Sequence, residues 1–273
     1  MQNQSERSVF FISDGTGITA ETLGLSLLTQ FEGIHFRQFR LPFVDTVDKA
    51  RDALAHITAT AQADGKRPIL VITMVNAEVR AIFENSDAFC LDMFGTFIQP
   101  LAAEIGRAPS QTVGIARSMK GSETYRQRIE AISYSLSHDD GVSNAGLEEA
   151  EVILVGVSRC GKTPTSIYLA MQFGIKAANY PLIPEDFERM KLPGILPQFR
   201  SRLFGLTISP ERLHRVRSER RPGSHYASLE NCRKEVRLSE ILMRQEGINW
   251  IDSTSRSIEE ISSTILQGIS TQI

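Results

Sequence analysis

One eight-residue stretch constrains this chain more than any other. It reads Gly156-Val157-Ser158-Arg159-Cys160-Gly161-Lys162-Thr163 and fits the pattern G-x-x-x-x-G-K-[ST] at every fixed position. An apolar run precedes it at residues 152–155, and a helix-like run follows at 165–171. In this order, glycines let backbone N–H groups point at phosphate oxygens, while the helix N-terminus and a lysine add positive charge. The sequence therefore predicts an α/β unit that binds phosphate groups.

The composition excludes several other classes of protein. The chain has 273 residues, 41% of them hydrophobic and 23% charged, which is typical of a globular protein with room for two modest domains. Its formal net charge of −2 gives no basic field for nucleic acid. No apolar run approaches the ~18 residues of a membrane span, and the first residues lack the apolar core of a signal peptide. Three widely spaced cysteines, Cys90, Cys160 and Cys232, do not form a disulfide framework, so we expect a cytoplasmic protein.

Strand and helix patterns alternate along most of the chain. Apolar runs predict strands at residues 9–12, 68–74, 88–92, 152–155, 203–208 and 249–252. Alternating apolar and polar side chains predict another at 36–43, and residues 176–180 read as an extended segment. Helical patterns lie between several of these segments. Such alternation indicates parallel sheets with crossover helices. The polar stretch that ends near Gly146 is the best candidate for a domain boundary. We therefore expect an α/β fold with an N-terminal α/β domain at 1–146, containing a parallel sheet, and a C-terminal P-loop kinase-like α/β domain at 147–273.

The loop at 156–163 supplies the positioned charge that phosphoryl transfer needs, and a metal ion and a general base remain to be found. The Lys162 ammonium is the candidate catalytic cation, whereas Arg159 either contacts a phosphate or points to solvent. Asp139 and Asp140 are candidate bases because they lie in a glycine-flanked turn before the loop strand, although paired acids in turns are usually solvated. Asp14, in a second glycine-rich loop after a strand, is a weaker candidate.

The metal ion, expected to be Mg²⁺, would be held by the hydroxyl of Thr163 and by a carboxylate. Asp252 and Asp92 each end an apolar strand, as a Walker B acid does. We prefer Asp252 because it belongs to the same predicted domain as the loop. The alternative is that each acid caps the helix that follows it.

Seven arginines cluster between residues 200 and 221. They are Arg200, Arg202, Arg212, Arg215, Arg217, Arg220 and Arg221. Guanidinium groups suit phosphate recognition and could close over a nucleotide as a lid. The alternative is a solvated helix face paired with Glu211 and Glu219. The sequence leaves both interpretations open, with some arginines functional and most structural.

Several motifs together resemble a known family. They are Ser13-Asp14-Gly15-Thr16-Gly17, His138-Asp139-Asp140-Gly141, the segment from Gly156 to Pro181, and Gly205-Leu206-Thr207-Ile208. They resemble the bacterial phosphoenolpyruvate synthase regulatory proteins, relatives of the pyruvate, phosphate dikinase regulatory proteins. The resemblance covers essentially the whole chain and is most specific at 156–166. One departure is Ser209, where relatives often carry Asp, so we assign no metal role there.

The resemblance implies two opposed activities on one partner, phosphoenolpyruvate synthase. In one direction the β-phosphoryl group of ADP is transferred to a threonine of the synthase and inactivates it. In the other, inorganic phosphate removes that phosphoryl group as pyrophosphate. The residues implied for nucleotide binding are 156–163. Because ADP and pyrophosphate both present a diphosphate, we expect one site to serve both reactions.

Two alternatives fit the phosphate loop without the resemblance. One is a P-loop kinase of small molecules or nucleotides, and the other is a nucleotide-sensing module without turnover. The sequence leaves the oligomeric state open, with a homodimer as one option.

Overall fold

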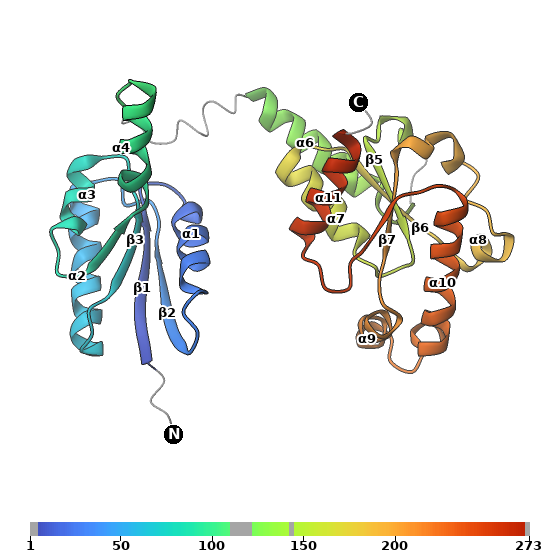
Figure 1. Cartoon of the computed structure of the whole chain (residues 1–273), viewed down its shortest axis with the longest axis horizontal. Helices are drawn as coiled ribbons and strands as arrows, with labels where there is room; N and C mark the ends of the chain where they lie inside the picture. The colour runs from blue at the N-terminus through green and yellow to red at the C-terminus, as the bar shows by residue number, and fades with distance from the viewer. Residues whose placement is uncertain (1–4, 110–121, 142–144, 271–273) are drawn as a thin grey trace. The chain divides into compact units, whose positions relative to one another are not determined.

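The structure is a computed structural model that describes residues 5–109, 122–141 and 145–270. It divides into two compact units, Met1–Met119 and Lys120–Ile273. Each unit holds a four-stranded sheet whose strand pairs are all parallel, with helices as crossover connections (Figure 1). The α/β fold with two domains is therefore confirmed.

The first unit alternates strands and helices without interruption. Its elements are β1 (Ser5–Ser13), α1 (Ile18–Leu28), β2 (Ile34–Leu41), α2 (Val47–Asp64), β3 (Ile69–Thr73), α3 (Ala77–Glu84), β4 (Phe89–Asp92) and α4 (Met93–Ile105). The strand order is β2-β1-β3-β4. Figure 1 shows α1 on one side of this sheet and α2 and α3 on the other.

The alternation of side chains along β1 explains why both faces of this sheet are covered. Successive residues of a strand point to opposite faces. Phe10 and Ile12 are buried in the cluster that includes Ile57 of α2, whereas Val9 and Phe11 are buried in the cluster that includes Ala20 of α1. The strand is apolar on both faces, as strands of a parallel sheet covered by helices usually are.

The second unit repeats this organisation around the phosphate loop. Its longer elements are α6 (Ser122–Ser137), β5 (Val152–Gly156), α7 (Lys162–Phe173), β6 (Ala177–Pro181), α8 (Pro184–Arg189), β7 (Leu203–Thr207), α9 (Pro210–Arg220), α10 (Leu229–Gln245), β8 (Trp250–Asp252) and α11 (Ile258–Ser270). Short 3₁₀ turns lie at Asp139–Gly141 (η1), Leu147–Glu149 (η2), Leu196–Arg202 (η3) and His225–Ala227 (η4).

The strand order of the second sheet places the phosphate loop at a reversal of the winding. The order is β6-β5-β7-β8, so the chain leaves β5 toward β6 and later returns to pair β7 on its other side. In open parallel sheets, ligands bind at the carboxyl ends of the strands at such a reversal. Figure 1 shows α6, α7 and α11 on one side of this sheet and α8 and α10 on the other.

The division between the units falls earlier in the chain than the expected boundary at 146/147. The helix α6 belongs to the second unit, where it packs against α7 and β6. Ala131 of α6 is fully buried, and Tyr134 joins the hydrophobic core around β5. The polar residues at 138–141 therefore follow a helix that already belongs to the second unit.

Gly205 in the middle of β7 gives a prediction about the packing of this core. A Cβ at this position would lie 2.3 Å from Sδ of Met243 and 2.7 Å from Cβ of Trp250. We expect Gly205→Ala to lower the free energy of unfolding by about 1–3 kcal/mol through overpacking, measured by urea denaturation. Gly194→Ala is the control, because no atom lies within 4 Å of its added Cβ. Equal stability of the two variants would contradict this account of the core.

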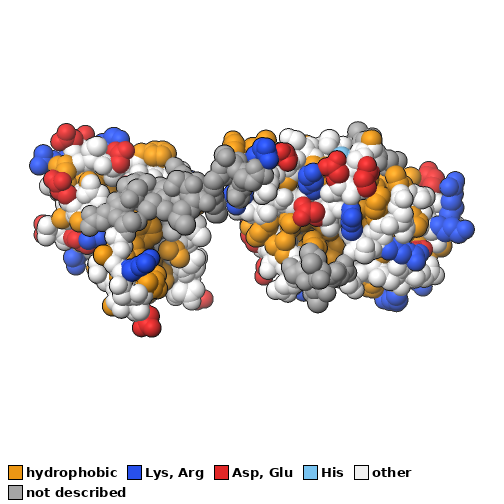
Figure 2. Space-filling model, turned by 90° about the horizontal axis from the view of Figure 1, so that it is seen from above, with side chains coloured by type: hydrophobic (Ala, Val, Ile, Leu, Met, Phe, Trp, Pro, Cys, Tyr) orange, Lys and Arg blue, Asp and Glu red, His pale blue; other side chains and the backbone are white. Residues whose placement is uncertain are grey.

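On the face of the molecule in Figure 2, both units carry acidic and basic side chains, with hydrophobic side chains between them. Within the ranges that the structure describes, no helix combines the length and the apolar character needed to cross a bilayer.

Candidate functional site

The phosphate loop joins the end of β5 to the start of α7, and two of its glycines are required by geometry. Gly156 has a φ of 150°, and a Cβ there would lie 2.2 Å from the carbonyl oxygen of Leu206 on the neighbouring strand. Gly161 has a φ of 98° and forms the N-terminal cap of α7. Both positions exclude other residues, the first by close approach and the second by backbone conformation. The two glycines of the motif are therefore required for different structural reasons.

Lys162 is the first residue of α7 and folds back over its own loop. Its side chain is buried, and Nζ donates hydrogen bonds to the carbonyl oxygens of Gly156 at 3.1 Å and Val157 at 2.9 Å. The ammonium group therefore lies against the loop backbone, where a bound phosphate would meet it. Arg159 has a left-handed φ of 74°, and its side chain is exposed.

Thr163, the last residue of the motif, meets the acidic turn that precedes β5. Its hydroxyl donates to Oδ1 of Asp139 at 2.9 Å and accepts from Nδ2 of Asn179 at 2.9 Å. The same Asn179 amide also lies within hydrogen-bonding distance of both Asp139 and Asp140. The structure therefore brings together the two acids and the threonine that the sequence singled out, with Asn179 between them.

His138 precedes the acidic turn, residues 139–141, and holds its backbone in place. This side chain is buried and stacked on Tyr134, and its ring nitrogens lie 2.9 Å and 2.8 Å from the carbonyl oxygens of Tyr134 and Ala145. The backbone carbonyl of His138 accepts the N–H of Asn179. Asp140 has a left-handed φ of 52°, an uncommon conformation for a residue other than glycine. The two carboxylates consequently differ: Asp139 is half-buried against Thr163, and Asp140 is exposed.

The other acids considered as metal ligands lie elsewhere. Asp252 ends β8, two strands away from β5, and its carboxylate accepts hydrogen bonds from the backbone N–H and hydroxyl of Thr254. Asp92 belongs to the first unit and caps α4 by accepting from the N–H of Phe94. The structure brings neither acid to Thr163. The capping alternative holds for Asp92. Asp252 instead closes a turn onto Thr254 and does not cap α11, whose first turn is capped by Ser257.

Asp14 also lies in the first unit, and its carboxylate accepts the N–H of Val75 at 2.8 Å. Burial raises the pKa of Asp14 above its usual value. This hydrogen bond connects the glycine-rich loop after β1 to the residues that follow β3.

Three of the seven clustered arginines have clear structural partners. Arg200 pairs with Glu246, and Arg202 donates to the carbonyl oxygens of Glu148 and Ala150. Arg217 is completely buried and donates to the loop carbonyl of Ser158. None of these three lies on a solvated helix face paired with Glu211 or Glu219: Arg200 and Arg202 have other partners, and Arg217 is buried against the phosphate loop.

Cys160 in the loop is not suited to nucleophilic chemistry. The residue is fully buried, and burial raises the pKa of its thiol above the usual value. A thiol with a raised pKa is protonated near neutral pH, and only the thiolate is a strong nucleophile. Its backbone carbonyl accepts from the hydroxyl of Ser253, which also donates to the carbonyl of Thr207. The loop is thereby tied to the ends of β7 and β8.

Sequence reasoning missed Asn179, Tyr226 and Ser253 as parts of this site. Asn179 carried a usable signal in the sequence, because it is a polar residue within a short extended segment, and the structure buries it almost completely. Buried polar groups need partners, so an amide in such a strand indicates other polar groups nearby. Among the described residues its Oδ1 has no hydrogen-bond partner. Tyr226 and Ser253 lie outside any recognisable motif and reach the loop only through the fold.

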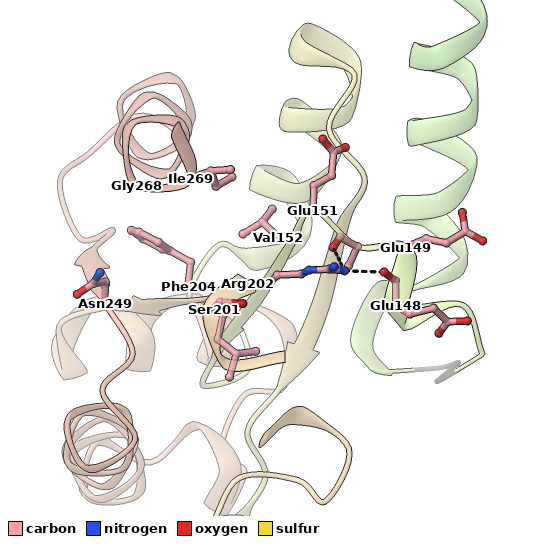
Figure 3. A pocket seen from close by; sticks show the side chains of 12 residues that line it. Glu148, Glu149, Glu151, Val152, Ser201, Arg202, Phe204, Asn249, Gly268 and Ile269 are labelled. Atoms are coloured by element: carbon pink, nitrogen blue, oxygen red, sulfur yellow. Dashed lines mark hydrogen bonds between the residues drawn. The ribbon is translucent and has the colours of Figure 1, made fainter. Parts of the chain in front are cut away.

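A cavity of about 400 Å³ lies at the amino ends of strands of the second sheet, away from the phosphate loop (Figure 3). It is lined by residues at the starts of β5 and β7, including Val152 and Leu203, and by Glu148, Glu149 and Glu151. Figure 3 shows Arg202 extended toward Glu148, where it donates to backbone carbonyls. The cavity is lined by three glutamates, and its Arg202 already donates to backbone carbonyls. It is therefore less suited to phosphate than the loop at the carboxyl ends of the strands.

Comparison with known proteins gives a consistent family. Residues 9–266 match the kinase/pyrophosphorylase family. A protein of Methylobacillus flagellatus is 62% identical over 264 residues, 97% of each chain. A protein of Aromatoleum aromaticum is 60% identical over 270 residues, 98% of each chain, and one of Herminiimonas arsenicoxydans is 57% identical over 268 residues, 98% of this chain and 95% of its own. All three carry the provisional name phosphoenolpyruvate synthase regulatory protein.

Proposed function

Since this chain belongs to the kinase/pyrophosphorylase family, we propose that it regulates phosphoenolpyruvate synthase by reversible threonine phosphorylation. ADP is the phosphoryl donor in one direction. In the other, inorganic phosphate accepts the phosphoryl group and leaves as pyrophosphate. The names of the relatives support the protein target, and the geometry around the phosphate loop supports the chemistry.

The observation that carries this proposal is the meeting of Thr163, Asp139 and Asp140 beside the loop. A phosphotransferase needs a diphosphate cradle, oxygen ligands for a metal ion and a base for the acceptor hydroxyl. Residues 156–163 supply the cradle, with Lys162 as its cation. The acidic turn supplies the other two requirements at one place.

The half-buried Asp139 and the hydroxyl of Thr163 fit Mg²⁺, because magnesium prefers oxygen ligands and is bound in such sites by one or two carboxylates plus substrate phosphates. The described residues contain no group of three or more His, Cys, Asp or Glu that would bind a metal ion without substrate. When bound, Mg²⁺ would neutralise charge on the phosphate oxygens. We therefore assign this role to Asp139 and no longer to Asp252.

Asp140 is the better placed base. It is exposed, and its carboxylate meets the Asn179 amide of β6 at 3.3 Å, so it is accessible to a hydroxyl on another protein. In the kinase direction Asp140 accepts the hydroxyl proton of the target threonine, and the threonine oxygen attacks the β-phosphorus of ADP. The bond from that phosphorus to the bridging oxygen breaks, and AMP leaves with the electron pair.

The opposite reaction uses the same groups. An oxygen of inorganic phosphate attacks the phosphorus of phosphothreonine, and the bond from phosphorus to the threonine oxygen breaks. The proton of the attacking phosphate passes through Asp140 to the departing threonine oxygen. The products are threonine and pyrophosphate, which occupies the cradle as the diphosphate of ADP does.

Labelled nucleotide tests the proposal directly. The purified chain is incubated with phosphoenolpyruvate synthase, Mg²⁺ and ADP labelled in its β-phosphoryl group. We expect label in a phosphothreonine of the synthase with one AMP released per transfer, and later addition of phosphate should move that label into pyrophosphate. ADP labelled at the α-phosphate is the control, since its label should stay in AMP. Label on a small molecule would instead favour a metabolite kinase, and binding without transfer would favour a sensor.

A further inference from the structure

Arg217 is the largest side chain among the fully buried residues that the structure describes. It lies in the last part of α9 with none of its side chain exposed. Burial of a guanidinium is costly unless its charge is paired and its N–H groups are hydrogen-bonded. Its partners therefore indicate why the charge is there.

The guanidinium of Arg217 divides its hydrogen bonds among three partners. Nε and Nη2 donate to the backbone carbonyl of Ser158 at 3.3 Å and 3.0 Å, and Nη1 donates to the carbonyl of Tyr226 at 3.0 Å. Nη2 also pairs with the Glu235 carboxylate at 2.7 Å. The guanidinium carbon lies 4.1 Å from the centre of the Tyr226 ring. All three of its nitrogen atoms are thus used, and two of them meet at one carbonyl of the phosphate loop.

The partners of Arg217 are themselves held in place. The hydroxyls of Ser158 and Tyr226 lie 3.0 Å apart. The Asn231 amide donates to Glu235 at 2.7 Å and to the Tyr226 carbonyl at 3.5 Å. Residues from α9, η4 and α10 therefore form one network around Ser158, in which Arg217 bonds the carbonyl of the peptide between Ser158 and Arg159.

The direction of that peptide matters for a bound diphosphate. In a trans peptide the carbonyl oxygen and the following N–H point to opposite sides. Because Arg217 holds the Ser158 carbonyl on the α9 side, the Arg159 N–H is directed away from α9. Arg159 also has a left-handed φ of 74°, which a residue other than glycine adopts at a cost unless its surroundings fix it.

We propose that Arg217 is a positioning residue for the diphosphate site, acting through the Ser158 carbonyl to aim the Arg159 N–H at a phosphate oxygen. This inference rests on the proposed function of the loop. Arg217 does not itself contact the substrate. Glu235 neutralises its charge, and Tyr226 fixes the plane of its guanidinium.

A merely structural clamp between helices is the competing explanation, and the chain offers a matched control for it. Arg233 of α10 pairs with Glu211 of α9 at 3.1 Å, so it joins the same two helices. That pair is exposed and does not include the loop. Arg233→Met should therefore leave diphosphate affinity unchanged.

The test measures binding and stability on the same variants. Calorimetry with Mg²⁺ and either ADP or pyrophosphate gives affinity, and urea denaturation gives the free energy of unfolding. We expect Arg217→Lys to bind both ligands about tenfold or more weakly, since its ammonium cannot contact Ser158, Tyr226 and Glu235 together and a hydrogen bond from a charged group has effects of this size.

The double variant Arg217→Met with Glu235→Leu separates positioning from stability. Replacing a buried ion pair by apolar residues often preserves stability, whereas removing one partner does not. We expect this variant to regain stability relative to Arg217→Met alone while its affinity stays at least tenfold below that of the wild type. A folded double variant with wild-type affinity would overturn the inference and leave Arg217 as a helix clamp.

Arg217→Lys keeps the test decisive if the double variant does not fold. Affinity within twofold of the wild type in this variant would also overturn the inference. If the wild-type chain itself gives no binding heat with ADP or pyrophosphate, the proposed diphosphate site is wrong, and the role of Arg217 falls with it.

Discussion

Replacing Lys162 with alanine should lower turnover by about 10²–10³-fold both for ADP-dependent phosphorylation and for phosphate-dependent removal of the phosphoryl group. The reason is geometric. The buried Nζ lies against the carbonyls of Gly156 and Val157, inside the loop that both diphosphates would share. A cation held there stabilises charge on the transferring group in either direction. Rates of AMP and pyrophosphate formation with purified phosphoenolpyruvate synthase measure the two losses.

Lys176→Ala is the matched control for Lys162→Ala. This lysine belongs to the same unit, but it pairs with Glu149 at the edge of the sheet away from the loop, so both rates should remain within about twofold of the wild type. Lys162→Met keeps an apolar stem in the buried position and guards against misfolding as the cause of lost activity. Retention of pyrophosphate formation with loss of the kinase reaction would show that the two reactions use different sites.

Asp140→Asn should lower the turnover of the kinase reaction by about 10²-fold or more, with little change in ADP affinity. An amide at this exposed position can still accept a hydrogen bond, but it cannot take the proton of the attacking threonine. Single-turnover transfer from labelled ADP to the synthase isolates this step from product release. Calorimetry on the same variant measures ADP affinity.

Asp139→Asn should behave differently, because Asp139 contacts Thr163 and is assigned to the metal ion. We expect its activity to need a higher Mg²⁺ concentration and to recover in part at saturation. If Asp139→Asn removes turnover at every Mg²⁺ concentration while Asp140→Asn does not, the roles of the two acids are exchanged. Wild-type turnover in both variants would show that neither acid takes part in catalysis, as expected for acids of a solvated turn.

The sequence predicted the parts of the fold that depend on local pattern. The loop with its flanking strand and helix lies within a short continuous segment, and most strands were readable as apolar runs, with β2 visible through alternation and β6 only as an extended segment. Three of the described helices, α4, α8 and α10, were not expected. In α4, Pro100 lies inside the helix, where proline usually indicates a break, and in α10 the buried face includes Cys232 and Ser239, which do not read as strongly apolar.

The candidate site was less predictable where it depends on distant residues. The acids at 139 and 140 could be named, but their contact with Thr163 required α6 to pack in the second unit. Asp252 looked suitable because it ends a strand, yet the strand order places β8 two positions away from β5. Arg217 was one of seven similar arginines, and only the tertiary structure distinguishes it by burial and by its contact with Ser158.

The internal hydrogen bonds of the loop bear on how nucleotides would be distinguished. Lys162, Arg217 and Ser253 each donate to carbonyl groups of the loop, so its backbone loses conformational freedom when the chain folds. A rigid binding site loses little conformational entropy when a ligand binds. Discrimination between ADP and pyrophosphate would then come from what lies outside the shared diphosphate, the adenosine group, and a change in loop shape would contribute little to it.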